Sequence, residues 1–144
     1  MTIEDTLGYT FSNKNLLNRA LTRKAYANEK KPHNKDCEDQ EIFQTLGDAV
    51  LKLILVEHLI ENGSNTRENI TNEKMNLESR VRLAEISRQL GIGTFIKLGI
   101  GEIKQKAHDK QSVLAETLEA LIAAIYLDGG YDVTKRTIIK WFNI

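Results

Sequence analysis

The sequence predicts an all-α protein, a bundle of several helices, and two observations carry this prediction. Two long stretches, residues 39–62 and 112–127, repeat apolar residues at the spacing of a buried helix. No stretch alternates apolar and polar residues as a surface β-strand does, and no segment is repeated. With 144 residues, 41% of them hydrophobic, the chain can bury a sizeable core, so we expect residues 1–144 to form one domain.

The first forty residues are expected to form two short helices and a loop. Thr2 is expected to cap the first helix and Ser12 the second. The inward side of the second helix is expected to carry Leu16, Leu17, Ala20 and Leu21. Residues 27–40 are polar and contain the only proline, which predicts a loop. Too few residues precede this loop for it to be a domain boundary.

Residues 39–62 form the longest predicted helix, with Gly63 expected as its C-cap. A broad apolar stripe on this helix is expected to face the core: Ile42, Phe43, Leu46, Ala49, Val50, Leu53, Ile54 and Ile60. Beside the stripe, Glu41, Gln44 and Asp48 share one face, because a helix turns about 100° per residue. Charges at the edge of a core are costly unless they are paired or hold a metal ion.

The segments between the two long helices predict shorter elements. Residues 70–77 and 79–90 read as two consecutive helices, with Ser79 capping the second and Gly91 ending it. Residues 99–110 contain glycine and lysine without helical periodicity, which indicates a loop. Near the C-terminus, Asp132 is expected to cap a last helix. The apolar residues of that helix are Val133, Ile138, Ile139 and Phe142.

Residues 112–127 form the second strongly apolar helix, ended by Gly129 and Gly130. Its expected core face consists of Val113, Leu114, Leu118, Leu121, Ile122 and Ile125. Glu116 and Glu119 lie three residues apart and are therefore neighbours on one side. Two buried helices with acidic patches suit a Mg²⁺ or Mn²⁺ site between them, since hard cations prefer oxygen ligands. The alternative is that these acids are solvated flanks of two core helices.

Composition and charge bound the function. Twenty basic and twenty acidic residues give a net charge of zero, so a nucleic-acid surface would have to come from local patches. Cys37 is the only cysteine, which excludes an internal disulfide and fits a reducing cytoplasm. No stretch resembles a signal peptide or is apolar for long enough to span a membrane, so we expect a cytoplasmic protein without a membrane partner.

Several motifs resemble one family. Residues 41–51, Glu-Ile-Phe-Gln-Thr-Leu-Gly-Asp-Ala-Val-Leu, resemble the ribonuclease III signature E-R-L-E-F-L-G-D-A/S-V-L. Residues 114–122, Leu-Ala-Glu-Thr-Leu-Glu-Ala-Leu-Ile, resemble the second acidic block of that family, L-A-D-x-x-E-A-L-I. Further similarity follows in the order of the family, at residues 7–17, 20–29, 83–93, 98–101 and 124–131. The chain thus resembles the ribonuclease III nuclease domain over nearly its whole length.

The resemblance implies a metal-dependent endoribonuclease that hydrolyses double-stranded RNA with Mg²⁺ or Mn²⁺. The metal-site positions of the family fall on Gln44, Asp48, Glu116 and Glu119, of which Asp48 and Glu119 match the most persistent, catalytic pair. Gln44 replaces a glutamate and brings no charge, and Glu116 replaces an aspartate and is one methylene longer. The loss of charge at Gln44 lowers the expected Mg²⁺ affinity, and the longer side chain of Glu116 is expected to displace a ligand oxygen. Glu41 matches a further acidic position and is expected to compensate in part.

The resemblance also implies partners. Family members dimerise through the helix that carries an aromatic knob where this chain has Thr45, so we expect a homodimer with a different contact. Positions that resemble the RNA-binding region are Thr71, Asn72, Lys74, Asn76 and Arg80, and a second basic stretch holds Lys104, Lys106, His108 and Lys110. Lysine and arginine on phosphates would give affinity without reading the RNA sequence. The alternative is an ordinary solvated loop.

Two other functions remain open. Gln44, Glu116 and Thr45 favour a catalytically impaired ribonuclease III-like module that binds RNA or ribosomes. The second alternative is a helical interaction domain in which the acidic residues have no catalytic or metal-binding role. The motifs that resemble the family in its own order argue against this alternative. The family commonly carries a double-stranded-RNA-binding domain after the nuclease domain, and residue 144 comes too early for one. We therefore expect either a short family member or a nuclease domain from a longer protein.

Overall fold

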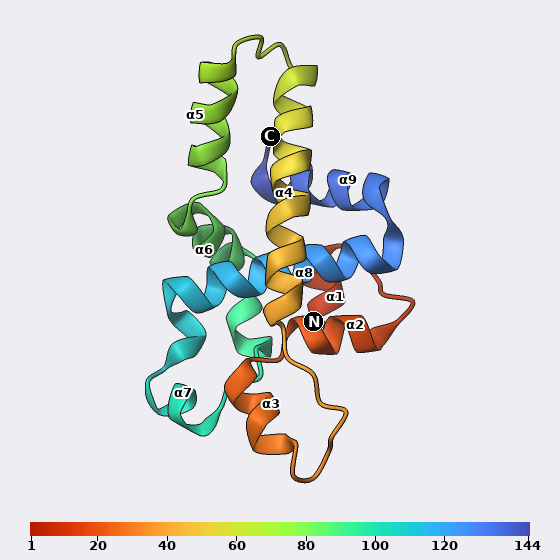
Figure 1. Ribbon diagram of the computed structural model, residues 1–144, viewed down its shortest axis with the longest axis vertical. Coiled ribbons are helices and arrows are strands. Elements are labelled where there is room, and N and C mark those ends of the chain that lie inside the picture. The colour runs from red at the N-terminus through yellow and green to blue at the C-terminus, as the bar shows by residue number, and fades with distance from the viewer.

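The computed structural model describes residues 1–144 and is helical throughout, which confirms the all-α prediction (Figure 1). The α-helices are α1 (Ile3–Leu7), α2 (Lys14–Ala20), α3 (Lys24–Lys30), α4 (Glu41–Glu61), α5 (Arg67–Leu77), α6 (Arg80–Gln89), α7 (Ile100–Lys104), α8 (Gln111–Gly129) and α9 (Tyr131–Phe142). Two 3₁₀ turns, η1 (Ile92–Phe95) and η2 (Ala107–Asp109), join them. The only extended pairing is one bridge between Thr22 and Lys97. No helix combines the length and hydropathy needed to cross a membrane.

The crossing of α4 and α8 organises the molecule. These two helices share the largest contact between any two elements, and α2, α6 and α9 pack around α8 (Figure 1). Gly47 lies where the two backbones meet. A Cβ atom on residue 47 would lie 1.7 Å from the carbonyl oxygen of Glu119, so a side chain there would drive the helices apart. Only glycine at this position allows the two helices to approach so closely.

The core follows the predicted face of α8 but only half of the stripe predicted for α4. All six α8 residues expected in the core are buried, and on α4 Phe43, Val50 and Ile54 are buried as well. The prediction is wrong for Ile42, Leu53 and Ile60, which are 68%, 56% and 56% exposed, and for Ala49, which is exposed as well. The apolar residues of α4 cover two faces. One face packs on α8, and the other has no covering element in a single chain.

The N-terminal helix signals are confirmed in part. Thr2 caps α1, where its side chain accepts from the N–H of Asp5. The Ser12 prediction is wrong, because the N–H of Ser12 donates to Asp128 and Asn13 provides the cap of α2. The chain therefore enters the helix one residue later.

The signals of the later helices also hold in part. The Ser79 hydroxyl accepts from Arg82, as a cap of α6 should, and Gly91 takes a left-handed conformation after that helix, with φ 66°. The C-cap of α4 is Asn62 and not Gly63, so this helix ends one residue earlier than predicted, and Gly63 follows with φ 99°. Asp132 lies inside the first turn of α9 and caps nothing, because that helix begins directly after Gly130.

Residues 99–110 are not a plain loop. The Glu102 carboxylate accepts from the N–H of Gly99 and closes the first turn of α7. At five residues, this helix is too short to produce a periodic apolar pattern.

Candidate active site

The α4–α8 crossing brings the predicted acidic pair together. Asp48 projects from α4 and Glu119 from α8, and their carboxyl groups are close enough for each to shift the pKa of the other. They line a pocket of about 420 Å³ at the crossing. The residues lining the pocket are Gln44, Thr45, Asp48, Glu78, Arg80, Leu83, Glu116 and Glu119. The predicted approach of Asp48 and Glu119 is confirmed, and their catalytic role remains a prediction.

The two carboxyl groups divide the charge unequally. Burial raises the pKa of Glu119 to about 8, and the hydrogen bond and negative charge of Asp48 act in the same direction. Burial also raises the pKa of Asp48, but hydrogen bonds from Lys52 and Glu119 and the charge of Lys52 outweigh it, so its pKa is lowered. At neutral pH the pair therefore holds an ionised Asp48 and a protonated Glu119.

Lys52 and Glu78 belong to this site although the sequence analysis did not find them. The ammonium nitrogen of Lys52 lies 2.7 Å from Oδ1 of Asp48 and 3.5 Å from Oε2 of Glu78. That Glu78 oxygen is buried and accepts no hydrogen bond. The i, i+4 spacing of Asp48 and Lys52 was a visible signal for their pairing. No sequence pattern linked Glu78 to the site, because it reaches the pocket from the end of α5.

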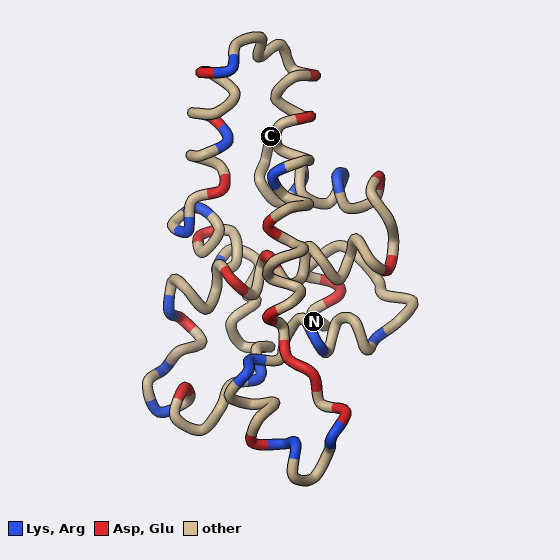
Figure 2. The backbone as a smooth tube through the Cα atoms, in the orientation of Figure 1, with Lys and Arg blue, Asp and Glu red and all other residues tan.

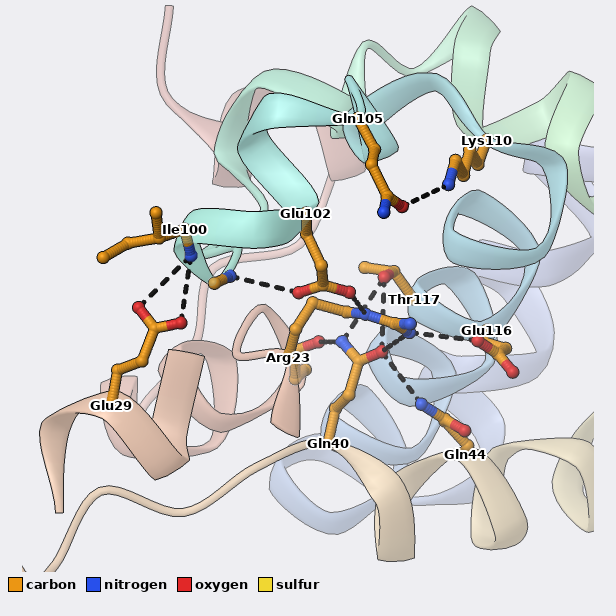
Figure 3. Close-up of polar contacts among 12 residues, drawn as sticks. Arg23, Glu29, Gln40, Gln44, Ile100, Glu102, Gln105, Lys110, Glu116 and Thr117 are labelled. Atoms are coloured by element: carbon orange, nitrogen blue, oxygen red, sulfur yellow. Dashed lines mark hydrogen bonds and ion pairs between the residues drawn. The ribbon is translucent and has the colours of Figure 1, made fainter. Parts of the chain in front are cut away.

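Glu116 is turned toward a cluster on the other side of the pocket (Figure 3). Arg23 donates from Nη1 to Oε1 of Glu116 at 3.0 Å and to Oε1 of Gln40 at 3.1 Å. Its Nε donates to Oε2 of Glu102 on α7 at 3.2 Å. Arg23 thus neutralises Glu116 and ties the acidic pocket to the segment that carries α7. No sequence pattern linked Arg23, Gln40 and Glu102, because these residues converge only in the fold.

Gln44 enters the same network (Figure 3). Its amide nitrogen donates to Oε1 of Gln40 at 2.9 Å. Gln40 is fully buried, and its own amide donates to the carbonyl oxygen of Ala20 and to the Thr117 hydroxyl. The buried acceptor on Gln40 therefore favours an amide over a carboxylate at position 44, and the Gln44 oxygen is left as a neutral candidate ligand.

Glu41 lies outside the pocket. Its carboxylate is 3.4 Å from the ammonium group of Lys24, and it lines a different surface hollow with Ile42. The expectation that Glu41 compensates for Gln44 is not supported, since it lies almost a full turn earlier on α4 and its side chain faces α3.

The site fits a divalent cation through two carboxylates. No three acidic, histidine or cysteine side chains converge as a ready metal cluster. Asp48 and Glu119 do meet, and Mg²⁺ commonly takes one or two protein carboxylates and completes its shell with water and phosphate oxygens. The Lys52 ammonium beside Asp48 marks the place as one that attracts a cation. These two carboxylates are therefore sufficient to bind the cation once the Lys52 ammonium moves away from Asp48.

Two of the predicted RNA-binding residues lie at this pocket. Arg80 lines it and forms no salt bridge, and its charge acts on Glu119. Lys74 lies 3.6 Å from Oε1 of Glu78. The positive charges of both residues lie near enough to the acidic pair to lower the pKa values, that of Lys74 acting on Asp48 and that of Arg80 on Glu119.

The other predicted RNA-binding residues are spread over the surface. Thr71, Asn72 and Asn76 are exposed on α5, and Asn76 lines a separate cleft beside the end of α4. Lys104, Lys106, His108 and Lys110 are exposed around α7 and η2. Figure 2 shows basic and acidic residues interspersed along the chain. The structure thus brings Lys74 and Arg80 to the pocket and leaves the rest apart.

An uncovered apolar face runs along α4. Ile42, Thr45, Ala49, Leu53 and Ile60 are all exposed and fall on one side of the helix, and we call them the α4 stripe. Thr45 also lines the acidic pocket. The stripe therefore begins beside the candidate active site and continues away from it.

Known proteins share this sequence and fold. A family model described as ribonuclease-III-like matches residues 13–143. Ribonuclease 3 of Oleidesulfovibrio alaskensis is 38% identical over 142 residues, which are 98% of this chain and 61% of that protein. Ribonuclease 3 of Fusobacterium nucleatum is 38% identical over 131 residues, 90% of this chain and 55% of that protein.

Solved structures agree with this similarity. The nuclease domain of ribonuclease III from Campylobacter jejuni superposes with a TM-score of 0.85 at 30% identity and covers 98% of this chain and 91% of that one. A second structure of that domain, described for flexibility in the region involved in dimer formation, gives a TM-score of 0.85 at 33% identity, covering 99% and 97%.

The fold, the acidic pair at the helix crossing and these similarities define the class: an all-α nuclease-type domain. The chain belongs to the ribonuclease-III-like family. It spans 61% and 55% of the length of the two relatives named above.

Proposed function

We propose that this protein is a metal-dependent endoribonuclease that cleaves double-stranded RNA, and that residues 1–144 form one nuclease domain. The observation that carries the proposal is the pairing of Asp48 with Glu119 at the α4–α8 crossing, with Arg80 at the rim of the same pocket. The family membership of the chain supports the same function.

Asp48 and Glu119 would hold a Mg²⁺ or Mn²⁺ ion, with the amide oxygen of Gln44 as a neutral donor and Glu116 as a further acid after release from Arg23. A bound divalent cation supplies Lewis-acid stabilisation of the charge that develops on the scissile phosphate. Glu119 must give up its proton to bind a cation, and the positive charge of Arg80 favours that loss.

Lys74 and Arg80 would bind phosphate oxygens of the RNA backbone beside the acidic pair. Contacts of this kind supply affinity and position without reading bases, as expected for the A-form duplex. The exposed lysines Lys104, Lys106 and Lys110 would extend this contact only if the duplex reaches α7.

The active form would be a homodimer joined through the α4 stripe. Ile42, Leu53 and Ile60 expose apolar side chains that one chain alone does not cover. Thr45 and Ala49 have small side chains, so a partner helix could approach α4 closely at these two residues. One chain supplies one acidic pocket, and cutting both strands of a duplex takes two.

The alternative is an RNA- or ribosome-binding module without catalysis. It is favoured by the internal neutralisation of the site, in which Lys52 is paired with Asp48 and Arg23 with Glu116. Gln44 removes one further charge. The lone, partly exposed Cys37 fits either function in a reducing cytoplasm.

Cleavage of long duplex RNA with Mg²⁺ or Mn²⁺ separates the two functions. The wild type should release short products, and Asp48→Asn and Glu119→Gln should release none while they keep the helical circular dichroism spectrum. Mn²⁺ should support cleavage better than Mg²⁺, since it generally binds such ligands more tightly. Duplex binding without cleavage under both metals would favour the binding module, and full cleavage by Asp48→Asn would refute the assigned site.

A further inference from the structure

Lys52 has no role in the proposed chemistry. Its ion pair with Asp48 is nevertheless the shortest ion pair that any acid of the pocket forms. We propose that Lys52 is a resident counter-ion of the metal site, which transfers from Asp48 to Glu78 when a divalent cation binds. Lys52 and Glu78 are then positioning residues that set the metal affinity. This inference rests on the proposed function, because it assigns Asp48 to the cation.

The first step is the occupation of Asp48. The Lys52 ammonium lies 2.7 Å from Oδ1 of Asp48, the distance of a strong charge-assisted hydrogen bond. Any cation that takes this oxygen must displace the ammonium group or accept its repulsion. Lys52 is one turn further along α4, and 42% of its side chain is exposed, so its flexible stem has room to swing.

In the second step, the Lys52 ammonium would move to Glu78. Glu78 Oε2 lies 3.5 Å from the Lys52 ammonium, is buried, and accepts no hydrogen bond. A buried carboxylate oxygen without a donor is costly, so this oxygen favours any donor that approaches. A movement of about 0.7 Å would bring the ammonium to an ordinary charge-assisted distance of about 2.8 Å. The neighbouring Lys74 lies near the other oxygen and leaves this one open.

In the third step, the cation would replace Lys52 as the partner of Asp48, and Lys52 would pair with Glu78. With the cation on Asp48 and Lys52 on Glu78, every charge in this part of the pocket keeps an opposite partner. Without Glu78, Lys52 would stay on Asp48 or lose its partner, and the cation would bind more weakly. Without Lys52, the cation would meet an unopposed carboxylate and bind more tightly.

A competing explanation gives Glu78 a direct role, as a ligand or as a long-range negative charge. Both explanations predict that Glu78→Gln weakens metal binding. They differ in a Lys52→Met background. If Glu78 acts by receiving Lys52, its substitution has no further effect once Lys52 is gone, whereas a direct role persists.

The test measures Mn²⁺ binding without RNA, by the loss of the electron paramagnetic resonance signal of free Mn²⁺ on titration with the full chain. The variants are Lys52→Met, Lys52→Gln, Glu78→Gln, the Lys52→Met/Glu78→Gln double variant, and Asp48→Asn. Lys24→Met is the matched control, because it removes a lysine from an exposed pair with Glu41 outside the pocket. Circular dichroism checks that each variant keeps its fold.

We expect Lys52→Met and Lys52→Gln to tighten Mn²⁺ binding roughly threefold to tenfold, the range for removing one nearby positive charge in a partly solvated site. Lys24→Met should change it less than about twofold. Glu78→Gln should weaken binding in the wild type and have no effect in the Lys52→Met background.

Three results would overturn the inference. Unchanged affinity in both Lys52 variants, with binding abolished by Asp48→Asn, would remove the role of Lys52 and leave the proposed metal site intact. Equal weakening by Glu78→Gln in both backgrounds would assign Glu78 to the cation itself. Absence of Mn²⁺ binding by the wild type and all variants would refute the metal site and the inference together.

Discussion

Gly47 on α4 and Glu119 on α8 are in direct backbone contact, since a Cβ atom on residue 47 would lie 1.7 Å from the Glu119 carbonyl oxygen. This contact sets how closely the two helices cross and therefore where Asp48, the next residue along α4, meets the Glu119 side chain. The geometry of the candidate active site depends on the absence of one side chain.

Gly47→Ala should therefore destabilise the protein by about 3 kcal/mol or more, at the upper end of the range for overpacking, because the added carbon meets backbone and not a movable side chain. Urea unfolding followed by circular dichroism measures this. Gly101→Ala is the control, since a Cβ there meets nothing within 4 Å and residue 101 is helical. Equal stability of the two variants would contradict the close crossing.

The stability of the wild type should fall as pH rises from about 4.5 to about 8. In the folded state the pKa of Glu119 is raised from an ordinary value of 4.5 to about 8. Between these values the folded state holds a proton that the unfolded state has released, so raising the pH favours unfolding. Glu119→Gln should flatten this slope in urea unfolding measured across the window, whereas Glu85→Gln, on the exposed side of α6, should keep it.

Gln44→Glu should strengthen divalent-metal binding and lower the Mg²⁺ concentration needed for cleavage, because it adds a fifth acid to the four that line the pocket. It should also destabilise the metal-free fold by about 1 kcal/mol, because it replaces the amide that donates to the buried Gln40 oxygen. A metal titration of duplex cleavage and urea unfolding measure the two effects. A variant that needs more Mg²⁺ than the wild type would exclude residue 44 from the metal site.

Arg23→Met should destabilise the protein by roughly 2–4 kcal/mol, because it leaves two partly buried carboxylates and the Gln40 oxygen without their shared donor. The added Glu102→Gln change should recover part of that loss by removing one unpaired charge. Arg136→Met, on the exposed side of α9, serves as the control in the same unfolding experiment. A wild-type stability for Arg23→Met would show that the cluster is dispensable.

Leu53→Glu should convert the proposed dimer to a monomer, because it places a charge in the middle of the α4 stripe. Sedimentation velocity at tens of micromolar measures the change. Ile103→Glu is the matched control, since Ile103 is similarly exposed, at 59% against 56%, but lies on α7. A wild type that sediments only as a monomer, or a dimer that survives Leu53→Glu, would rule out this interface.

Local patterns in the sequence predicted most of the helices and one acidic pair, but not α3 or the five-residue α7. The apolar spacing in residues 112–127 predicted α8 and its buried face correctly, because every face but the acidic one is apolar. The same reasoning failed for α4, because apolar spacing alone does not tell a face that packs on α8 from one left uncovered. Ile42, Leu53 and Ile60 were assigned to the core for that reason.

What the sequence determined by itself is the all-α class and the identity of Asp48 and Glu119 as the central acids. Each follows from neighbours on one helix or from one ordered set of motifs. Only the tertiary structure decided the partners of those acids. Arg23 pairs with Glu116, and Glu78 reaches the pocket from the end of α5. Such pairings join residues far apart in the chain, and their energies depend on distance and burial, which the order of residues does not state.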